Sequence, residues 1–210
     1  MLHPPNGGWR IHVTGSSDNA ATGSVFEVIV SRSSTKKFAD TPLGRNQIEA
    51  LLTAAVRAPD HGLLAPWRFT ILEGNSRRIL GDAMSAALLE KMPDADAEAR
   101  QREASKAFRS PVLIVVSALP QSHPKVPAVE QLVAVGAAIQ NLWIAAHSMG
   151  LGAAWKTGSH AYSSTVKRAL SLMEDEQILG FVHVGVPLSK AVVRPADLSG
   201  KVRWLQDLRQ

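Results

Sequence analysis

The feature that most constrains the fold is the long apolar stretch from Val129 to Met149, which is interrupted near its middle by Gln140 and Asn141. The stretch predicts a helix, and a helix that is apolar nearly all round is expected to be buried on every side. A chain of 210 residues suggests one domain. In so small a domain, such burial is easiest when a second subunit covers one face of the helix.

The same stretch does not predict a membrane span, because a spanning helix needs about 20 apolar residues in a row. We therefore expect a soluble protein without membrane association. The first residues also lack the positively charged start and apolar block of a signal peptide. The chain contains no cysteine, which agrees with a reducing compartment. Together these features favour a cytoplasmic location.

Along the rest of the chain, the spacing of apolar residues predicts helices that alternate with strands. Asn46 and Glu49 predict the start of one helix, and Asn75 predicts the start of another; Gly150 and Gly152 end the long helix. Such an alternation fits either repeated βαβ units or an α+β fold with helices on a mixed sheet. The predicted helices cover 24–31, 46–56, 75–88, 94–108, 129–149 and 163–170, and the predicted strands cover 69–72, 112–116, 153–157 and 178–186.

The two ends of the chain look different from this middle part. Residues 1–23 are rich in Pro, Gly and polar residues and predict a flexible extension, which leaves 24–210 as the folded domain. From Pro187 to Gln210 the chain contains proline and has little periodicity. This C-terminal segment is interpreted as an arm that wraps a partner.

Composition and motifs exclude several classes of function. Without cysteine there are no disulfides, thiolate metal sites or thiol nucleophiles, and the seven histidines do not occur at metal-ligand spacings, so no metal is expected. The phosphate-binding, zinc-protease and serine-hydrolase motifs are absent. The formal charge of +5 and isoelectric point of about 9.8 permit nucleic-acid binding. However, the basic residues are scattered, so we expect no nucleic-acid partner.

A basic, hydroxyl-rich loop follows the first predicted helix and contains Arg32, Ser33, Ser34 and Lys36. A phosphate group needs such donors, and an arginine can give it two parallel hydrogen bonds. Taken alone, the loop is also compatible with an ordinary solvated surface. It is a candidate anion site.

Two further clusters have the same ambiguity. Arg57 and His61 flank a forced helix end and are either ligand contacts or cations that cap the helix. Trp155, Lys156 and Thr157 end a predicted strand after two glycines, where the tryptophan is either a binding residue or part of the core. The order of the three clusters along the chain is more informative than any one of them.

In that order, the clusters resemble the FMN-dependent nitroreductase family. The stretch 30–38 is similar to the opening R-x-S-x-[RK]-x-F signature, and 54–61 with 66–69 is similar to the A-P-[SD] and P-W-x-F segments that follow it. The R-A-P-D-H sequence at 57–61 resembles a subgroup of small NAD(P)H nitroreductases. Residues 150–158 and 185–187 also look like the family, so the resemblance covers about 24–194.

Membership of this family implies an α+β, nitroreductase-like fold, with helices packed around a mixed, mainly antiparallel sheet in an intertwined homodimer. It also implies FMN at the subunit interface. By match, Arg32 and Ser34 serve the phosphate and ribityl chain, with Ser33 beside them, and Lys36 approaches the N1–C2=O edge of the ring. The resemblance further assigns flavin contacts to other residues: Arg57 and His61 from the partner subunit, Trp155, Lys156 and Thr157 at the strand end, and Arg194 near the phosphate.

The activity implied by the resemblance is transfer of hydride from NADH or NADPH through flavin N5 to a nitroaromatic, quinone or similar conjugated acceptor by a ping-pong mechanism. The flavin carries the chemistry, so no catalytic side chain is expected. Lys36 is interpreted as an electronic tuner, because a cation near N1 stabilises the reduced ring. Two alternatives remain: a flavin-binding carrier or sensor with little turnover, and a basic nucleic-acid-binding protein.

Overall fold

The computed structural model describes residues 24–189 and 192–205. The predicted extension, 1–23, lies outside them. Helices and strands alternate as expected, with short 3₁₀ turns between some of them. In chain order the main elements are α1 (Val25–Ser31), α2 (Arg45–Ala55), β1 (Trp67–Glu73), α3 (Arg77–Lys91), α4 (Ala97–Ser105), β2 (Val112–Ala118), α5 (Ala128–Ser148), β3 (Gly152–Lys156), α6 (Ser164–Ala169) and β4 (Gln177–Gly185).

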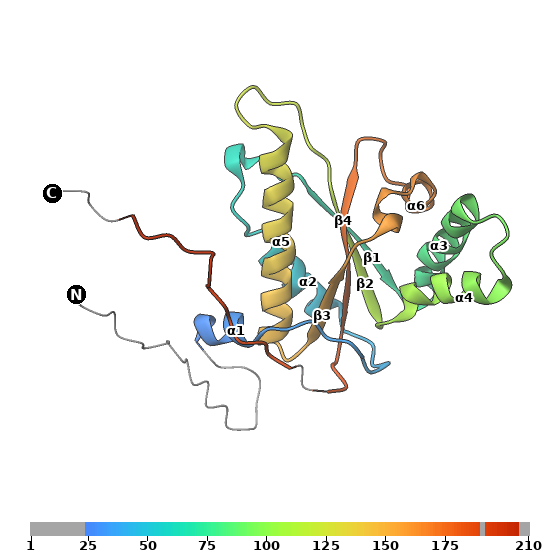
Figure 1. The fold of residues 1–210 in the computed structure, drawn as a ribbon, viewed down its shortest axis with the longest axis horizontal. Helices are drawn as coiled ribbons and strands as arrows, with labels where there is room; N and C mark the ends of the chain where they lie inside the picture. The colour runs from blue at the N-terminus through green and yellow to red at the C-terminus, as the bar shows by residue number, and fades with distance from the viewer. Residues whose placement is uncertain (1–23, 190–191, 206–210) are drawn as a thin grey trace.

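The four strands form one sheet in the order β1-β2-β4-β3 (Figure 1). Every pairing between these described strands is antiparallel, so the expected α+β fold with a mainly antiparallel sheet is confirmed. The βαβ alternative is wrong, since a βαβ unit requires parallel neighbours. β3 lies at one edge of the sheet, and its register places Ala154 opposite His183 of β4.

Helices cover both faces of the sheet, because alternate strand residues point to opposite sides. α2 and α5 pack on one face, where Ile114, Val116 and Val182 belong to the same buried cluster as Leu142. α3 and α6 pack on the other, where Leu113, Val115 and Phe181 share a second cluster with helix residues such as Leu80. Figure 1 shows the sheet between α5 on one side and α3, α4 and α6 on the other.

The long helix α5 is buried less completely than its sequence predicts. Eight of its residues, Ile139 and Leu142 among them, are buried against the sheet and α2. By contrast, Val129 and Val133 are 62% and 67% exposed, so one side of the helix is open in a single chain. By length and composition alone α5 resembles a membrane span, but its buried residues form the centre of the larger core.

Two predicted helix starts are wrong by one or two residues. α2 begins after Gly44, whose N–H donates to the Gln47 side chain at 2.9 Å, so Asn46 is inside the helix. α3 begins after Ser76, because Asn75 lies in a 3₁₀ turn. Gly150 ends α5 with φ near 72°, which favours glycine, whereas Gly152 belongs to β3. In both helices, the N-cap is a residue close to the asparagine that the sequence predicted for that position.

The described part of the C-terminal segment, 192–205, contains no helix or strand. It follows a short bridge between Phe38 and Pro187, which joins the end of β4 to the loop after α1. Its role as an arm around a partner therefore stays a prediction.

Candidate functional site

Arg32 ends α1 in an extended conformation and turns its side chain back toward α5. Its guanidinium carbon lies 4.2 Å from the centre of the Trp143 ring, a cation–π contact. Its Nη1 atom is buried and has no hydrogen-bond partner among the described residues. A buried cationic donor without a partner is costly, and an anion placed against it would remove that cost. Arg32 therefore fits a phosphate group.

The loop after Arg32 is held against β3. The Thr35 amide donates to Ala153 O at 3.0 Å, and the Thr35 side chain is buried. It sits over Gly152, where an added Cβ would lie only 2.4 Å from Thr35 Oγ1. On either side of Thr35, Ser34 and Lys36 are exposed. Glycine at 152 thus lets the loop pack closely while the two predicted site residues remain accessible.

His147 on α5 closes the other side of this loop. Ser31 Oγ donates to Glu27 O at 2.6 Å, so it accepts from His147 Nε2, which lies 2.9 Å away. Burial lowers the pKa of His147, and the nearby Arg32 guanidinium lowers it further. His147 is therefore neutral near pH 7 and adds no second positive charge beside Arg32.

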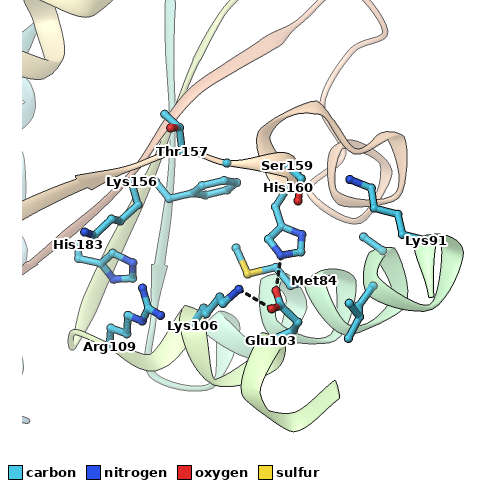
Figure 2. Close-up of a pocket in the computed structure, with 14 residues that line it drawn as sticks. Met84, Lys91, Glu103, Lys106, Arg109, Lys156, Thr157, Ser159, His160 and His183 are labelled. Carbon is cyan, nitrogen blue, oxygen red and sulfur yellow. Dashed lines mark hydrogen bonds and ion pairs between the residues drawn. The ribbon is translucent and has the colours of Figure 1, made fainter. Parts of the chain in front are cut away.

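A cavity of about 360 Å³ lies on the opposite face of the sheet, between β3, β4, α3 and α4. Figure 2 shows Lys156, Lys106 and Arg109 around it, with Thr157 and Ser159 above. Lys91 also lines it, and Glu103 is the one carboxylate among the lining residues. The cavity therefore carries a positive potential, which suits an anionic or electron-rich ligand.

Glu103 is already paired with two neighbours. Its carboxylate accepts from Lys106 Nζ at 2.5 Å and pairs with His160 Nε2 at 2.6 Å. Burial raises the pKa of Glu103, but the hydrogen bonds from Lys106 and His160 outweigh it, and the net pKa is lowered. Lys156 and Arg109 have no ion-pair partner in the described part of the chain. These two cations remain available to a ligand.

His183 forms part of the cavity wall and is only 3% exposed. Its Nδ1 lies 2.9 Å from Ser110 Oγ. Burial lowers the pKa of His183 to about 4, and Arg109 and Lys156 contribute to the lowering. The imidazole is therefore neutral near pH 7, although two cations lie beside it.

Arg109 connects the cavity with the basic loop. It lines the cavity and also a second, more open depression bordered by Phe38, Ala39 and Asp40. These three residues directly follow Lys36 and Lys37 in the chain. Arg109 therefore lies between the cavity and the end of the basic loop.

Some of the predicted site residues do not lie near this surface in one chain. The Trp155 side chain packs against the core, and its Nε1 donates to Leu179 O at 2.9 Å. His61 pairs with Glu130 in the first turn of α5 at 2.6 Å. His147, beside Arg32, lies 17 residues further along the same helix, a distance of roughly 25 Å at 1.5 Å per residue.

Arg57 and Arg194 are both exposed. Arg57 follows the end of α2, close in sequence to His61, and Arg194 lies in the C-terminal segment without regular structure. Neither has an ion-pair partner among the described residues. Their contacts with a ligand stay predictions.

Sequence reasoning missed the cavity residues Lys106, Arg109 and His183. One signal was present, because His183 interrupts the otherwise apolar run of the last strand. A buried polar residue in such a run needs a partner or a function. No local pattern distinguishes Lys106 and Arg109, which follow α4, from the basic residues Arg100 and Arg102 within it.

Comparison with known proteins identifies the family of this chain. The sequence model of the Nitroreductase family matches residues 29–186, which is most of the chain. The chain belongs to the nitroreductase family. It is 32% identical over 166 residues to "Putative NAD(P)H nitroreductase YdjA" of Escherichia coli K12, covering 79% of this chain and 90% of that protein. A protein of the same general designation from Haemophilus influenzae is 30% identical, with coverages of 78% and 89%.

Solved structures of this family share the fold. A nitroreductase-like family protein from Bacillus cereus superposes with a TM-score of 0.79 at 24% identity, covering 90% of this chain and all of that one. A nitroreductase with bound FMN from Bacteroides fragilis gives 0.69 at 21% identity, covering 88% of this chain and all of that one. The resemblance inferred from the motifs is confirmed at the level of family and fold.

Proposed function

We propose that this chain is an FMN-dependent oxidoreductase that passes hydride from NADH or NADPH to a nitroaromatic, quinone or similar conjugated acceptor by a ping-pong mechanism. The observation that carries the proposal is Arg32 Nη1, a buried donor without a partner among the described residues, at the head of an exposed Ser34–Lys36 loop. Both relatives carry the name "Putative NAD(P)H nitroreductase", and one solved structure of the same fold holds FMN.

The residues of the loop suit the two polar parts of FMN. Arg32 would bind the phosphate, with Ser33 and Ser34 along the ribityl chain, because a guanidinium forms strong charge-assisted bonds with phosphate. Lys36 would lie toward the ring. Thr157, at the rim of the cavity, would contact the ring from the end of β3.

Two copies of the chain are needed for the complete site. His61 pairs with Glu130 near the start of α5 and Arg32 stacks on Trp143, 13 residues further along the helix, a separation of roughly 20 Å at 1.5 Å per residue. Arg57 and His61 would therefore reach the flavin of the partner subunit. The exposed Val129 and Val133 on α5, and Val25, Phe26 and Ile29 on α1, provide the apolar surface that a homodimer would bury.

When bound, FMN would supply the redox chemistry, which is transfer of hydride from the nicotinamide through N5 to the acceptor. The protein contributes binding, orientation and charge. Lys36 would place a cation near N1 and C2=O and so favour the reduced state. Glu130, paired with His61, would hold that imidazole in one orientation.

The first test is the visible spectrum of the purified protein, before and after release of the chromophore by heat. We expect stoichiometric FMN, followed by oxidation of NADH or NADPH when a quinone is added. A colourless protein that also refuses added FMN contradicts the proposal. A yellow protein without turnover would instead identify a flavin carrier.

A further inference from the structure

The loop between α2 and β1 holds an exposed leucine in a backbone conformation that bulky residues rarely adopt. Leu63 is 89% exposed and has a φ of 54°. Gly62 before it has a φ of 79°, and Ala65 two residues later has a φ of 46°. A single exposed leucine needs no explanation by itself, but a bulky residue in the left-handed region costs free energy, and such strain gathers at functional sites. Leu63 is therefore a candidate for a role outside folding.

Side-chain hydrogen bonds hold this loop in its strained form. Asp60 Oδ2 accepts from the Ala65 amide at 2.6 Å, which closes the loop on itself. Gln121 Nε2 donates to Leu64 O at 2.8 Å. Gln121 is in turn fixed to the buried Gln131 of α5, which accepts from its amide and donates to its carbonyl, each at 2.8 Å. The loop is thus attached to α5, and the outward leucine is a fixed feature of it.

The loop lies at the edge of the surface that the proposed homodimer buries. His61 pairs with Glu130 in the first turn of α5, next to the exposed Val129. In Figure 1 the turn that contains His61 lies beside the N-terminal part of α5, on the side of the helix away from the sheet. The Leu63 amide donates to Asp60 O at 3.2 Å, so Leu63 stays within one turn of His61. A loop that brings His61 to the flavin of the partner subunit therefore brings Leu63 there as well.

The side chain that this loop presents is apolar. Leu64 is half-buried, and Asp60 turns its carboxylate into the loop, where Oδ1 is buried. An apolar cover excludes water from the place where hydride is transferred. A charged acceptor would lose hydration against a leucine side chain without gaining a partner. The loop therefore suits a flat conjugated acceptor that carries no charged substituent.

We propose that Leu63 of one subunit covers the acceptor position beside the flavin of the partner subunit and favours apolar acceptors over charged ones. The inference rests on the proposed function, because it requires FMN and a homodimer, and it extends that function to a specificity-determining residue. The substrate class is a quinone or nitroaromatic without a charged group. Asp60 and Gln121 are positioning residues, because they hold the loop that presents the leucine.

The test compares two acceptors with the holoenzyme in the steady state. Menadione is an apolar naphthoquinone, and a naphthoquinone sulfonate has the same ring system with a negative charge. Leu63→Asn has a similar size, and asparagine tolerates the left-handed conformation. We expect kcat/KM for menadione to fall about tenfold, the effect of losing the burial of a leucine side chain, with little change for the sulfonate. An equal change for both quinones, or none for either, would overturn the inference.

Further measurements separate acceptor binding from a structural role. The FMN dissociation constant and the sedimentation coefficient of Leu63→Asn should match those of the unmodified protein, and a weaker dimer would assign Leu63 to the subunit contact and overturn the inference. Met173→Asn makes a similar change at a residue that is 58% exposed between α6 and β4. It should leave the ratio of the two quinones unchanged. An unmodified protein without FMN or without turnover would overturn the proposed function together with the inference.

Mixed dimers test whether Leu63 acts across the interface. One chain carries Arg32→Leu, so that at limiting FMN only the site formed around Arg32 of the other chain is occupied. When Leu63→Asn is added to the Arg32→Leu chain, it faces the occupied site of its partner, and the loss of menadione activity should appear in full. When Leu63→Asn is placed in the other chain, the activity should be normal. The reverse pattern would show that Leu63 acts in its own subunit and would overturn the assignment.

Discussion

The two faces of the sheet are built from the same four strands but have different interiors. Under α5 and α2, the inward side chains are apolar, and Ile114, Val182 and Leu142 are fully buried. Under α3 and α4, the apolar cluster ends before the tip of β3, and a cavity lined by cations takes its place (Figure 2). The first face contributes mainly to the stability of the fold. The second face places cationic side chains around a cavity, next to its apolar cluster.

The difference arises from where the helices pack. α5 runs for 21 residues along the sheet and covers one face with α2. On the other face α3 and α6 contribute buried residues, whereas α4 has none, so its Glu103 lines the opening that they leave. We call the face covered by α2 and α5 the closed face, and the face that holds the cavity the open face. A mutation in the closed face should therefore change the stability of the fold. A mutation in the open face should change ligand binding or the pH dependence of stability.

The largest expected effect concerns the closed face. Ile139→Ala removes a fully buried side chain from α5, and such truncations cost about 2–5 kcal/mol. Urea unfolding followed by circular dichroism measures the loss. Ile79→Ala is the matched control, since it makes the same change at a position on α3 that is 48% exposed. If the two variants lose similar stability, the contrast between a closed and an open face is wrong.

The second effect concerns the open face and depends on pH. The pKa of His183 is lowered to about 4 from an ordinary value of 6.5. Between these values the unfolded chain binds the proton and the folded chain does not, so stability is complete above pH 6.5 and falls with decreasing pH. The difference corresponds to about 3 kcal/mol lost by pH 4.

His183→Leu isolates this contribution. The variant should show a smaller loss of unfolding free energy between pH 7 and pH 4 than the unmodified protein. Other groups titrate in both proteins, so the comparison uses the difference between the two profiles. The pKa of His147 is lowered as well, and its contribution remains in the variant. Parallel profiles would show that His183 is not held neutral by its surroundings.

The closed face is also the part of the fold that the sequence predicts best. The apolar run of α5 and the continuous apolar run of β2 identify buried elements directly, and all seven residues of β2 are buried. The helix starts are less predictable, because Gly44 and Asn46 are both acceptable terminal residues. The open side of α5 differs from the prediction because a single chain offers nothing to cover it.

The site shows the same division. Arg32 and Lys36 are close in sequence, so a motif finds them together. Arg109, Lys156 and His183 come from three separate segments, and the antiparallel pairing of β3 with β4 places two of them on one wall beside Arg109. Trp155 shows the opposite case, because alternation along β3 sends its side chain into the core while Lys156 faces the cavity.

The third effect tests whether Arg32 serves binding and not stability. Arg32→Leu should weaken FMN binding by roughly 10- to 100-fold, as expected for loss of a charged hydrogen-bond donor. The apoprotein should unfold at nearly the same urea concentration, because Nη1 has no partner in the described structure. Arg45→Leu, on the exposed side of α2, is the matched control and should bind FMN normally. A strongly destabilised Arg32→Leu apoprotein would assign Arg32 to the core.

The smallest effect concerns Lys36, which is exposed in the loop after α1. A cation near N1 and C2=O stabilises the reduced ring by about 1 kcal/mol in a solvated position. Lys36→Met should therefore lower the midpoint potential of the bound flavin by about 20 mV for a two-electron couple. The neighbouring Lys37→Met removes the same charge from the next residue and should change the potential less. An unchanged potential in Lys36→Met, or an equal change in Lys37→Met, would show that no specific contact with the ring exists and that the loop only contributes general positive charge.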